Sequence, residues 1–226
     1  MTVHLQNDIE ARHREMLEMG GRVEEMVRRS VALLNDCDYE AAVDFGRMDD
    51  EIDRTEVRIE DECLKTLALH QPVAGDLRKI VAVMKITGEL ERVADLAVNI
   101  AERSLGVAGH DGVEVPTGVG EMSKIAVDML RHAIDAYVRE DAAVARQVRR
   151  DDSRVDQLNG EVIQKITAAI AARPDRVEPL LHLFSAARLI EQVADHAVVI
   201  AEDVVYYVEG EFIRHQSMFE ADEDAT

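Results

Sequence analysis

The chain has 226 residues and carries 46 acidic side chains against 26 basic ones, a formal net charge of −20 at pH 7. This balance argues against binding to nucleic acid or docking on anionic membrane surfaces, because both favour clustered Lys and Arg. Apolar residues make up 47% of the chain and aromatic residues only 4%. That composition is typical of packed helices, so we expect an all-α protein.

Apolar side chains in the first part of the chain recur at helical spacing. They step by three, four or seven residues within residues 9–33, and again within residues 41–66. Near-heptad stripes of this kind are typical of elongated helical bundles. Asp38 is expected to cap the second helix, and Pro72 to lie in the first turn of a third. Residues 1–107 are therefore predicted to form a three-helix bundle.

A glycine-rich segment separates this unit from the rest of the chain. Five of the twelve glycines fall within residues 106–120. Because glycine clusters break helices, we predict a linker at residues 108–116. A second three-helix bundle is predicted for residues 117–216, with Pro174 in the first turn of its last helix. Residues 217–226 are expected to be a frayed acidic tail.

The two predicted bundles repeat one another. The sequence ERVADLAVNIAE at residues 91–102 matches EQVADHAVVIAE at residues 191–202 in nine of twelve positions. Upstream, the motif D-x-x-[IV]-D occurs at residues 49–53 and again at residues 152–156. Two motifs in the same order at near-equal spacing indicate a duplication. The predicted fold is therefore two tandem, internally duplicated three-helix bundles with six long helices.

The repeated motifs place carboxylates at helical spacing. Glu91, Asp95 and Glu102 fall within about 40° of one another on one helical face. Like charges four residues apart repel, so pairs kept in both halves indicate that cations balance them. Clustered carboxylates accept iron, manganese, magnesium or zinc. The alternative is a solvated acidic face that nearby arginines neutralise. The candidates for this role are Arg54, Arg58 and Arg92.

Other kinds of site have little support in the sequence. A ferritin-like di-iron site needs two Glu-x-x-His motifs, and only Glu10–His13 matches. The other histidines lack convergent partners, and no nucleotide-binding or nucleophile motif occurs. Cys37 and Cys63 form no CxxC pair. No segment has the pattern of a signal peptide or a membrane span. These observations predict a cytoplasmic protein that is not an enzyme.

Several stretches resemble the signatures of the PhoU family, the regulatory proteins of phosphate transport systems. They are QPVAGDLR at residues 71–78, LERVAD at residues 90–95 and NIAE at residues 99–102. The stretch AEDVVYYVEG at residues 201–210 is similar to the last helix of that family. The likeness covers roughly residues 1–216, with the motifs in order. It implies two similar three-helix bundles and negative control of phosphate uptake.

The resemblance also implies partners. Members of the family act on the ATPase subunit of the phosphate ABC transporter and, in many bacteria, on the phosphate-sensing histidine kinase. A homo-oligomer such as a homodimer is expected, because long bundles leave faces to cover. The partner surface is predicted on the first half. Its residues would be Gln71, Pro72, Asp76, Arg78 and Arg92.

Metal binding is a further implication, since family members bind iron clusters and zinc through E(D)xxxD motifs. Iron is therefore the metal expected here, with zinc, manganese or magnesium as alternatives. In this sequence the motifs stand at Asp49/Asp53, Glu91/Asp95, Asp152/Asp156 and Glu191/Asp195, with Glu102 and Glu202 as additional ligands.

The second half departs from the family pattern. Gln192 replaces the expected Arg, Val199 replaces the expected Asn, and residues 173–175 are only a partial echo of QPxAxDLR. The second acidic site is therefore expected to differ in geometry or occupancy. Two other functions stay open at this stage. One is a metal-dependent enzyme built on the carboxylates, and the other is a metal-free helical scaffold.

Overall fold

The computed structural model describes residues 3–108, 110, 113–211 and 213. Six long helices follow one another, with a short 3-10 helix, η1 (Pro174–Arg176), before the last. The described residues contain no strand. The prediction of an all-α fold with two three-helix units is confirmed. The helices are α1 (Val3–Asn35), α2 (Tyr39–His70), α3 (Ala74–Val107), α4 (Thr117–Arg139), α5 (Ala142–Ala172) and α6 (Val177–Glu209).

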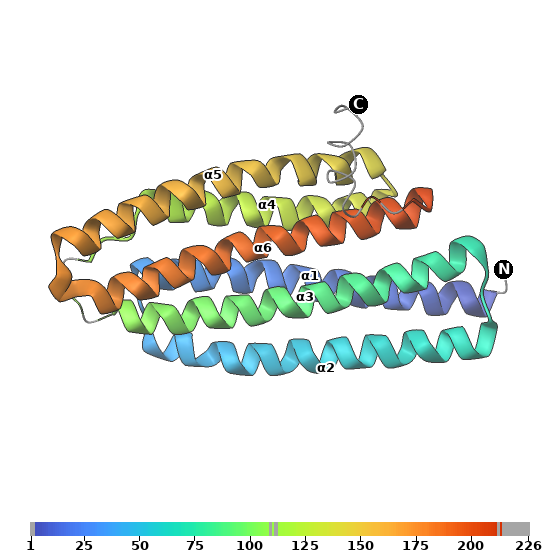
Figure 1. Cartoon of the computed structure of the whole chain (residues 1–226). Helices are drawn as coiled ribbons and strands as arrows, with labels where there is room; N and C mark the ends of the chain where they lie inside the picture. The colour runs from blue at the N-terminus through green and yellow to red at the C-terminus, as the bar shows by residue number, and fades with distance from the viewer. Residues whose placement is uncertain (1–2, 109, 111–112, 212, 214–226) are drawn as a thin grey trace, which may run out of the picture.

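The helices lie roughly along one common direction, and the two bundles sit side by side (Figure 1). α1, α2 and α3 form the first bundle, and α4, α5 and α6 form the second. The bundles join where α3 packs against α6 and α1 packs against α4. α2 and α5 consequently lie on the two outer edges of the molecule (Figure 1).

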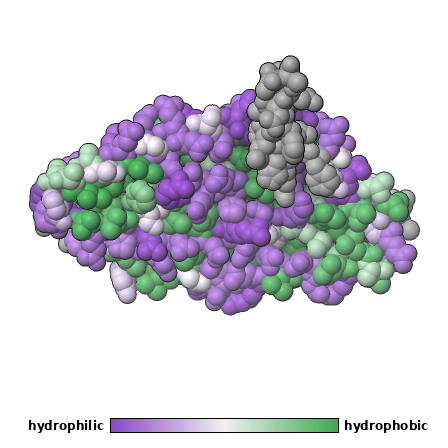
Figure 2. Space-filling view, in the orientation of Figure 1, coloured by the Kyte–Doolittle hydropathy of each residue, from purple (hydrophilic) through white to green (hydrophobic). Residues whose placement is uncertain are grey.

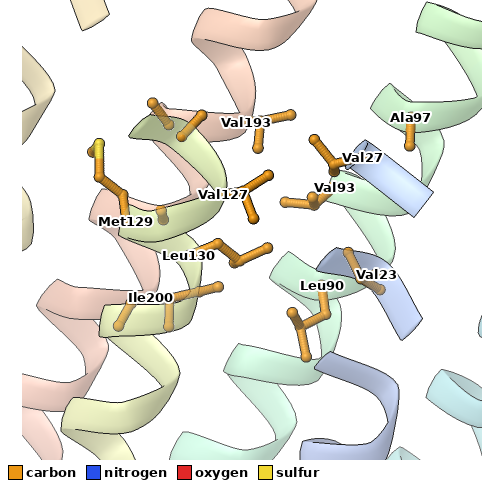
Figure 3. Packing of buried hydrophobic residues seen from close by; sticks show 14 of the residues in the cluster. Val23, Val27, Leu90, Val93, Ala97, Val127, Met129, Leu130, Val193 and Ile200 are labelled. Carbon is orange, nitrogen blue, oxygen red and sulfur yellow. The ribbon is translucent and has the colours of Figure 1, made fainter. Parts of the chain in front are cut away.

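Both bundles share one apolar core. Leu90 and Val93 of α3 lie among buried side chains of α1, α4 and α6 (Figure 3). All buried apolar residues in the described part of the chain belong to a single cluster. The helices approach closely here: a Cβ atom at Gly20 of α1 would lie 2.8 Å from Cδ1 of Ile134 in α4. The two halves are therefore expected to unfold together.

The helix starts agree with one capping prediction and correct two others. The Asp38 side chain accepts a hydrogen bond from the backbone of the first turn of α2, as expected. Pro72, however, precedes α3, which begins at Ala74. Pro174 begins η1 rather than α6, which starts at Val177. In both halves the chain must first turn out of the preceding helix, and the residue before a proline disfavours the helical conformation.

The two first helices differ in length. α1 has 33 residues, whereas α4 has 23. α3 ends at Val107 and α4 begins at Thr117, so the predicted linker falls between them. The predicted tail at residues 217–226 lies outside the described residues. Within those residues, no helix combines the length and the apolar character needed to cross a membrane.

The surface is mostly hydrophilic, but apolar residues gather toward both ends of the molecule (Figure 2). Where α2 ends and α3 begins, the exposed apolar side chains are those of Leu69, Val73 and Leu77. At the start of α6 they include Leu181 and Phe184. Each third helix thus begins on an exposed apolar surface.

Candidate functional site

Carboxylates of α2 and α3 face each other in the first bundle. Burial and the charges of Asp53, Asp95 and Asp50 raise the pKa of Asp49 to about 6. Burial and the charge of Asp53 also raise the pKa of Asp95. The pKa of Glu91 is raised by burial and then by Asp95 and Asp53. We call Asp49, Asp53, Glu91 and Asp95 the first acidic cluster.

The second bundle repeats this arrangement between α5 and α6. Burial raises the pKa of Asp152 to about 6, together with the charges of Asp156, Asp195 and Glu191. Burial likewise raises the pKa of Glu191 and of Asp195. These four residues form the second acidic cluster. The structure therefore brings together the four predicted pairs as two clusters, one in each half.

The equivalent aspartates of the two clusters share an unusual feature. Oδ1 of Asp49 and Oδ1 of Asp152 are both buried and accept no hydrogen bond. Oε2 of Glu191 is also buried and accepts no hydrogen bond. The great majority of buried polar side-chain atoms have a hydrogen-bond partner. A buried carboxylate oxygen that lacks one carries a cost in free energy. Two equivalent orphaned oxygens indicate that a cationic partner fits both places.

The donor set suits a hard or borderline cation, because each cluster offers carboxylates from two neighbouring helices. As they stand, no three His, Cys, Asp or Glu side chains of the described residues are grouped to hold an ion. Binding would therefore have to draw the carboxylates of two helices together. Glu102 is exposed two turns beyond Asp95, and Glu202 takes the equivalent place beyond Asp195.

The arginines that were candidates for neutralising the first cluster bind carboxylates outside it. Arg54 pairs with Asp50 at 3.4 Å and Arg58 with Glu15 at 2.7 Å. Arg92 pairs with Glu89, although its charge also offsets part of the repulsion at Glu91.

In the second cluster, by contrast, Arg188 binds Glu191 directly at 3.0 Å. The position equivalent to Arg188 in the first half is Gly88. The second cluster is therefore the better neutralised of the two.

Two polar contacts between the halves were not foreseen from the sequence. Nζ of Lys85 lies 2.6 Å from Oδ1 of the buried Asp203. Nδ1 of His196 lies 2.7 Å from Oε2 of Glu89, so this histidine is satisfied by a carboxylate. One feature of the sequence could have pointed to the second contact: Glu89 and His196 each align with a leucine in the other repeat. Both pairs join α3 to α6.

The corner between α2 and α3 combines a strained backbone with exposed apolar side chains. Gln71 and Ala74 both adopt left-handed conformations, with φ of 46° and 49°. This conformation is costly for residues other than glycine. The corner exposes Leu69, Val73 and Leu77. We call residues 69–77 the α2–α3 corner.

The predicted partner residues do not form one surface. Gln71, Pro72 and Asp76 lie at the α2–α3 corner. Arg78 lies next to the corner, but its Nε donates to the backbone carbonyl of Tyr207 in α6 at 3.2 Å. Arg92 lies roughly 21 Å further along α3 at the usual helical rise. Arg78 thus joins the two halves and Arg92 lies apart from the corner. The part of these five residues in partner binding stays a prediction.

Comparison with known families gives a match over both halves. The PhoU domain model matches residues 16–104 and again residues 119–204. The two matched segments begin in α1 and α4 and end in α3 and α6, so each spans one bundle.

Named relatives match most of the chain. The phosphate-specific transport system accessory protein PhoU homolog of Aquifex aeolicus is 33% identical over 216 residues, which cover 96% of this chain and 98% of the relative. The homolog of Pseudomonas aeruginosa is 35% identical over 203 residues, covering 88% of this chain and 83% of the relative.

Solved structures show the same architecture. The crystal structure of PhoU from Pseudomonas aeruginosa superimposes with a TM-score of 0.84 at 32% identity, covering 91% of this chain and 99% of that one. The phosphate transport system regulatory protein PhoU from Streptococcus pneumoniae also gives 0.84, at 24% identity, over 92% of this chain and 99% of that one. At that lower identity the likeness concerns the fold alone.

Proposed function

Because the chain belongs to the PhoU family, we propose that it is a regulator that restrains phosphate uptake and phosphate-starvation signalling. The names of the relatives as phosphate-specific transport system accessory proteins support this role. We propose that it does so without catalysing a reaction. Burial raises the pKa of Cys63 to about 11, which makes this thiol a poor nucleophile.

We further propose that both acidic clusters bind metal. The observation that carries this proposal is the pair of orphaned buried oxygens on Asp49 and Asp152. Asp53, Glu91 and Asp95 would complete the first site, and Asp156, Glu191 and Asp195 the second. A bound cation supplies the positive charge that offsets repulsion among the carboxylates. Iron is the metal we expect, with zinc, manganese and magnesium as alternatives that the same donors accept.

The α2–α3 corner is the surface that we propose for the partner. Exposed apolar side chains next to a strained backbone are typical of a binding surface. The proposed partners are the ATPase subunit of the phosphate ABC transporter and, where the host has one, the phosphate-sensing histidine kinase. Both would meet this protein in the cytoplasm. A homo-oligomer such as a homodimer is part of the same proposal.

Deletion of the gene tests the regulatory role. In phosphate-rich medium we expect the deletion strain to express phosphate-starvation reporters that the parent strain keeps repressed. Unchanged repression would sink the proposal. Complementation then separates the parts: a variant with Leu69, Val73 and Leu77 changed to Ser should fail to restore repression. The matched control is Val57→Ser, which removes an exposed apolar side chain elsewhere on α2.

Metal analysis after oxygen-free purification tests the clusters. Wild-type protein should retain metal, and Asp49→Asn with Asp95→Asn should remove the share bound by the first cluster. Asp50→Asn is the control, because it lies beside the cluster on the exposed side of α2. Metal-free wild-type protein from metal-replete cells would favour the scaffold interpretation. Turnover of phosphoesters or dioxygen that is lost on Asp95→Ala would favour an enzyme instead.

A further inference from the structure

The duplication is incomplete at one end of the second bundle. The upstream motifs are offset by 103 residues, so the first residue of α4, Thr117, corresponds to Arg14 of α1. Among the residues that the structure describes before Thr117, the part of α1 before Arg14 thus has no helical counterpart in the second half. In the first half this segment covers the end of α2 and the start of α3. Its Leu5 and Ile9 are buried there, and Asp8 lies 3.1 Å from His70.

A cavity occupies the corresponding place in the second half. It has a volume of about 470 Å³ and lies where the end of α5 meets the starts of α4 and α6. Val113 and Val115, which precede α4, lie along one side, while Ile166, Ala169 and Leu180 provide an apolar wall. In the orientation of Figure 1 this is the left end of the second bundle. The cavity falls within the usual range of small-molecule sites.

Cationic side chains gather around this cavity although the whole chain is strongly acidic. Lys165, Arg173 and Arg176 line it, with Glu114 as the lining carboxylate. Arg173 holds Asp175 through two hydrogen bonds of 3.0 and 2.8 Å, and Nε of Arg176 lies 4.0 Å from the same carboxylate. Lys165 makes no ion pair with any residue that the structure describes. The local excess of positive charge favours an anionic ligand.

Two helix N-termini add to this charge. Neither Pro116 before α4 nor Arg176 before α6 makes a side-chain cap hydrogen bond. Both residues line the cavity. The first backbone N–H groups of a helix carry partial positive charge and bind phosphate groups readily. The cations and the two helix starts thus act on the same space.

We propose that this cavity binds a small phosphorylated metabolite, with its phosphate on Lys165 and Arg176 and its organic part against the apolar wall. The proposal is separate from the acidic clusters and from the α2–α3 corner. It predicts one site per chain, because α1 fills the equivalent place in the first half.

Calorimetry on the full chain tests the proposal, with chelator present so that metal at the acidic clusters contributes nothing. The probes are AMP, inorganic phosphate and adenosine. We expect AMP to bind with a stoichiometry of one, and both other probes to bind at least about tenfold more weakly. Lys165→Gln with Arg176→Gln should weaken AMP binding by about tenfold or more.

Two further variants make the test specific. Lys124→Gln with Arg150→Gln removes the same charge from α4 and α5 away from the cavity, and should leave AMP binding unchanged. Ala169→Phe fills the cavity, so it should abolish AMP binding while inorganic phosphate still binds. Thermal melts establish that each variant is folded. The proposal is overturned if AMP does not bind up to about 1 mM, if inorganic phosphate or adenosine binds as tightly, or if the Lys165/Arg176 variant binds AMP normally.

Discussion

The burial of residues 91–100 is repeated position by position at residues 191–200, yet the surroundings of the two acidic clusters differ. Arg188 binds Glu191 in the second half, where the first half has Gly88. His196 stands beside Asp195, where the first half has a leucine, and its charge partly offsets the raised pKa of Asp195. The duplicated carboxylates have kept their arrangement while their electrostatic environment diverged. We therefore expect the first cluster to bind cations more strongly.

The contact between the halves shows a second difference. α3 and α6 run antiparallel (Figure 1), so duplication alone would give two equivalent contacts across the interface. One is the polar pair of Glu89 and His196. The aligned positions in the other copy are Leu189 and Leu96, which pack against the core. Because one contact is polar and the other apolar, other alignments of α3 against α6 would pair polar with apolar side chains and are disfavoured. Buried polar groups select one alignment of helices in some proteins.

The largest expected loss of stability comes from a substitution in the core that the two bundles share. Leu90→Ala should lower the free energy of unfolding by about 3 kcal/mol, because it leaves a cavity in fully buried packing. Leu90 is in the first half, whereas three of the four tyrosines, Tyr137, Tyr206 and Tyr207, are in the second. The fourth, Tyr39, is exposed at the start of α2 and so should contribute little to the fluorescence change. Urea titrations followed by circular dichroism and by tyrosine fluorescence should give coincident transitions. Separate transitions would contradict a common core. Val57→Ala, at an exposed position, is the control and should change stability by less than about 0.5 kcal/mol.

Much of this fold could be predicted from the sequence, because helical periodicity and the repeat both report on local structure. The stripes within residues 9–33 and 41–66 correspond to the buried faces of α1 and α2. The four carboxylate pairs could be found for the same reason: residues four apart share a helical face in any packing. Their meeting across two helices followed from the three-helix topology.

Contacts between the halves could not be predicted in this way. Lys85 and Asp203 are 118 residues apart. The periodicity of apolar residues within each helix does not predict which face of α3 packs against which face of α6. The role of Arg78 was missed for the same reason, since its acceptor is a backbone carbonyl of α6. The left-handed Gln71 also escaped prediction, because this residue ends α2 in a conformation that glycine usually supplies and glutamine does not favour.

The next effect concerns the polar contact between the halves. Lys85→Met leaves the buried carboxylate of Asp203 without this cation, and should cost about 2 kcal/mol of unfolding free energy. Lys65→Met makes the same change in an exposed pair on α2, where solvent screens the charges and the cost should be much smaller. Urea titrations measure both. Equal costs for the two variants would mean that the contact between α3 and α6 does not stabilise the protein.

A smaller effect compares the two acidic clusters directly. The pKa of Asp152 is about 6 in the folded protein, above its ordinary value of 3.8. The folded state therefore binds the proton more tightly, so this stability is present below pH 4 and is lost as the pH rises through 6. In chelator-treated protein, Asp152→Asn should gain about 1 kcal/mol at pH 7.5 after allowance for solvent screening.

Thermal melts at pH 4 and pH 7.5 check this prediction, and the gain should disappear at pH 4. Asp49→Asn should behave alike, because burial and neighbouring carboxylates raise the pKa of Asp49 to the same value. Asp50→Asn, outside the cluster, should show a smaller gain, because its charge is the weakest of those that raise the pKa of Asp49. A gain for Asp152→Asn that is the same at both pH values would contradict the electrostatic cause.

The smallest expected change in stability distinguishes the turn between α2 and α3 from the turn between α5 and α6. Gln71 ends α2 with φ of 46°, whereas Arg173 ends α5 with φ of −135°. Gln71→Gly should stabilise the protein by about 0.5 to 1 kcal/mol, because glycine adopts left-handed backbone without strain. Arg173→Gly should instead destabilise it slightly, since glycine there adds only unfolded-state entropy.

Opposite signs for these two variants in urea titrations would establish that only the first corner is strained. If that strain serves partner binding, Gln71→Gly should also weaken repression of phosphate-starvation reporters while its stability rises. A more stable variant with normal repression would separate the strain from function. The strained backbone would then be a consequence of how the chain turns between α2 and α3, and partner binding at the corner would depend on the exposed side chains alone.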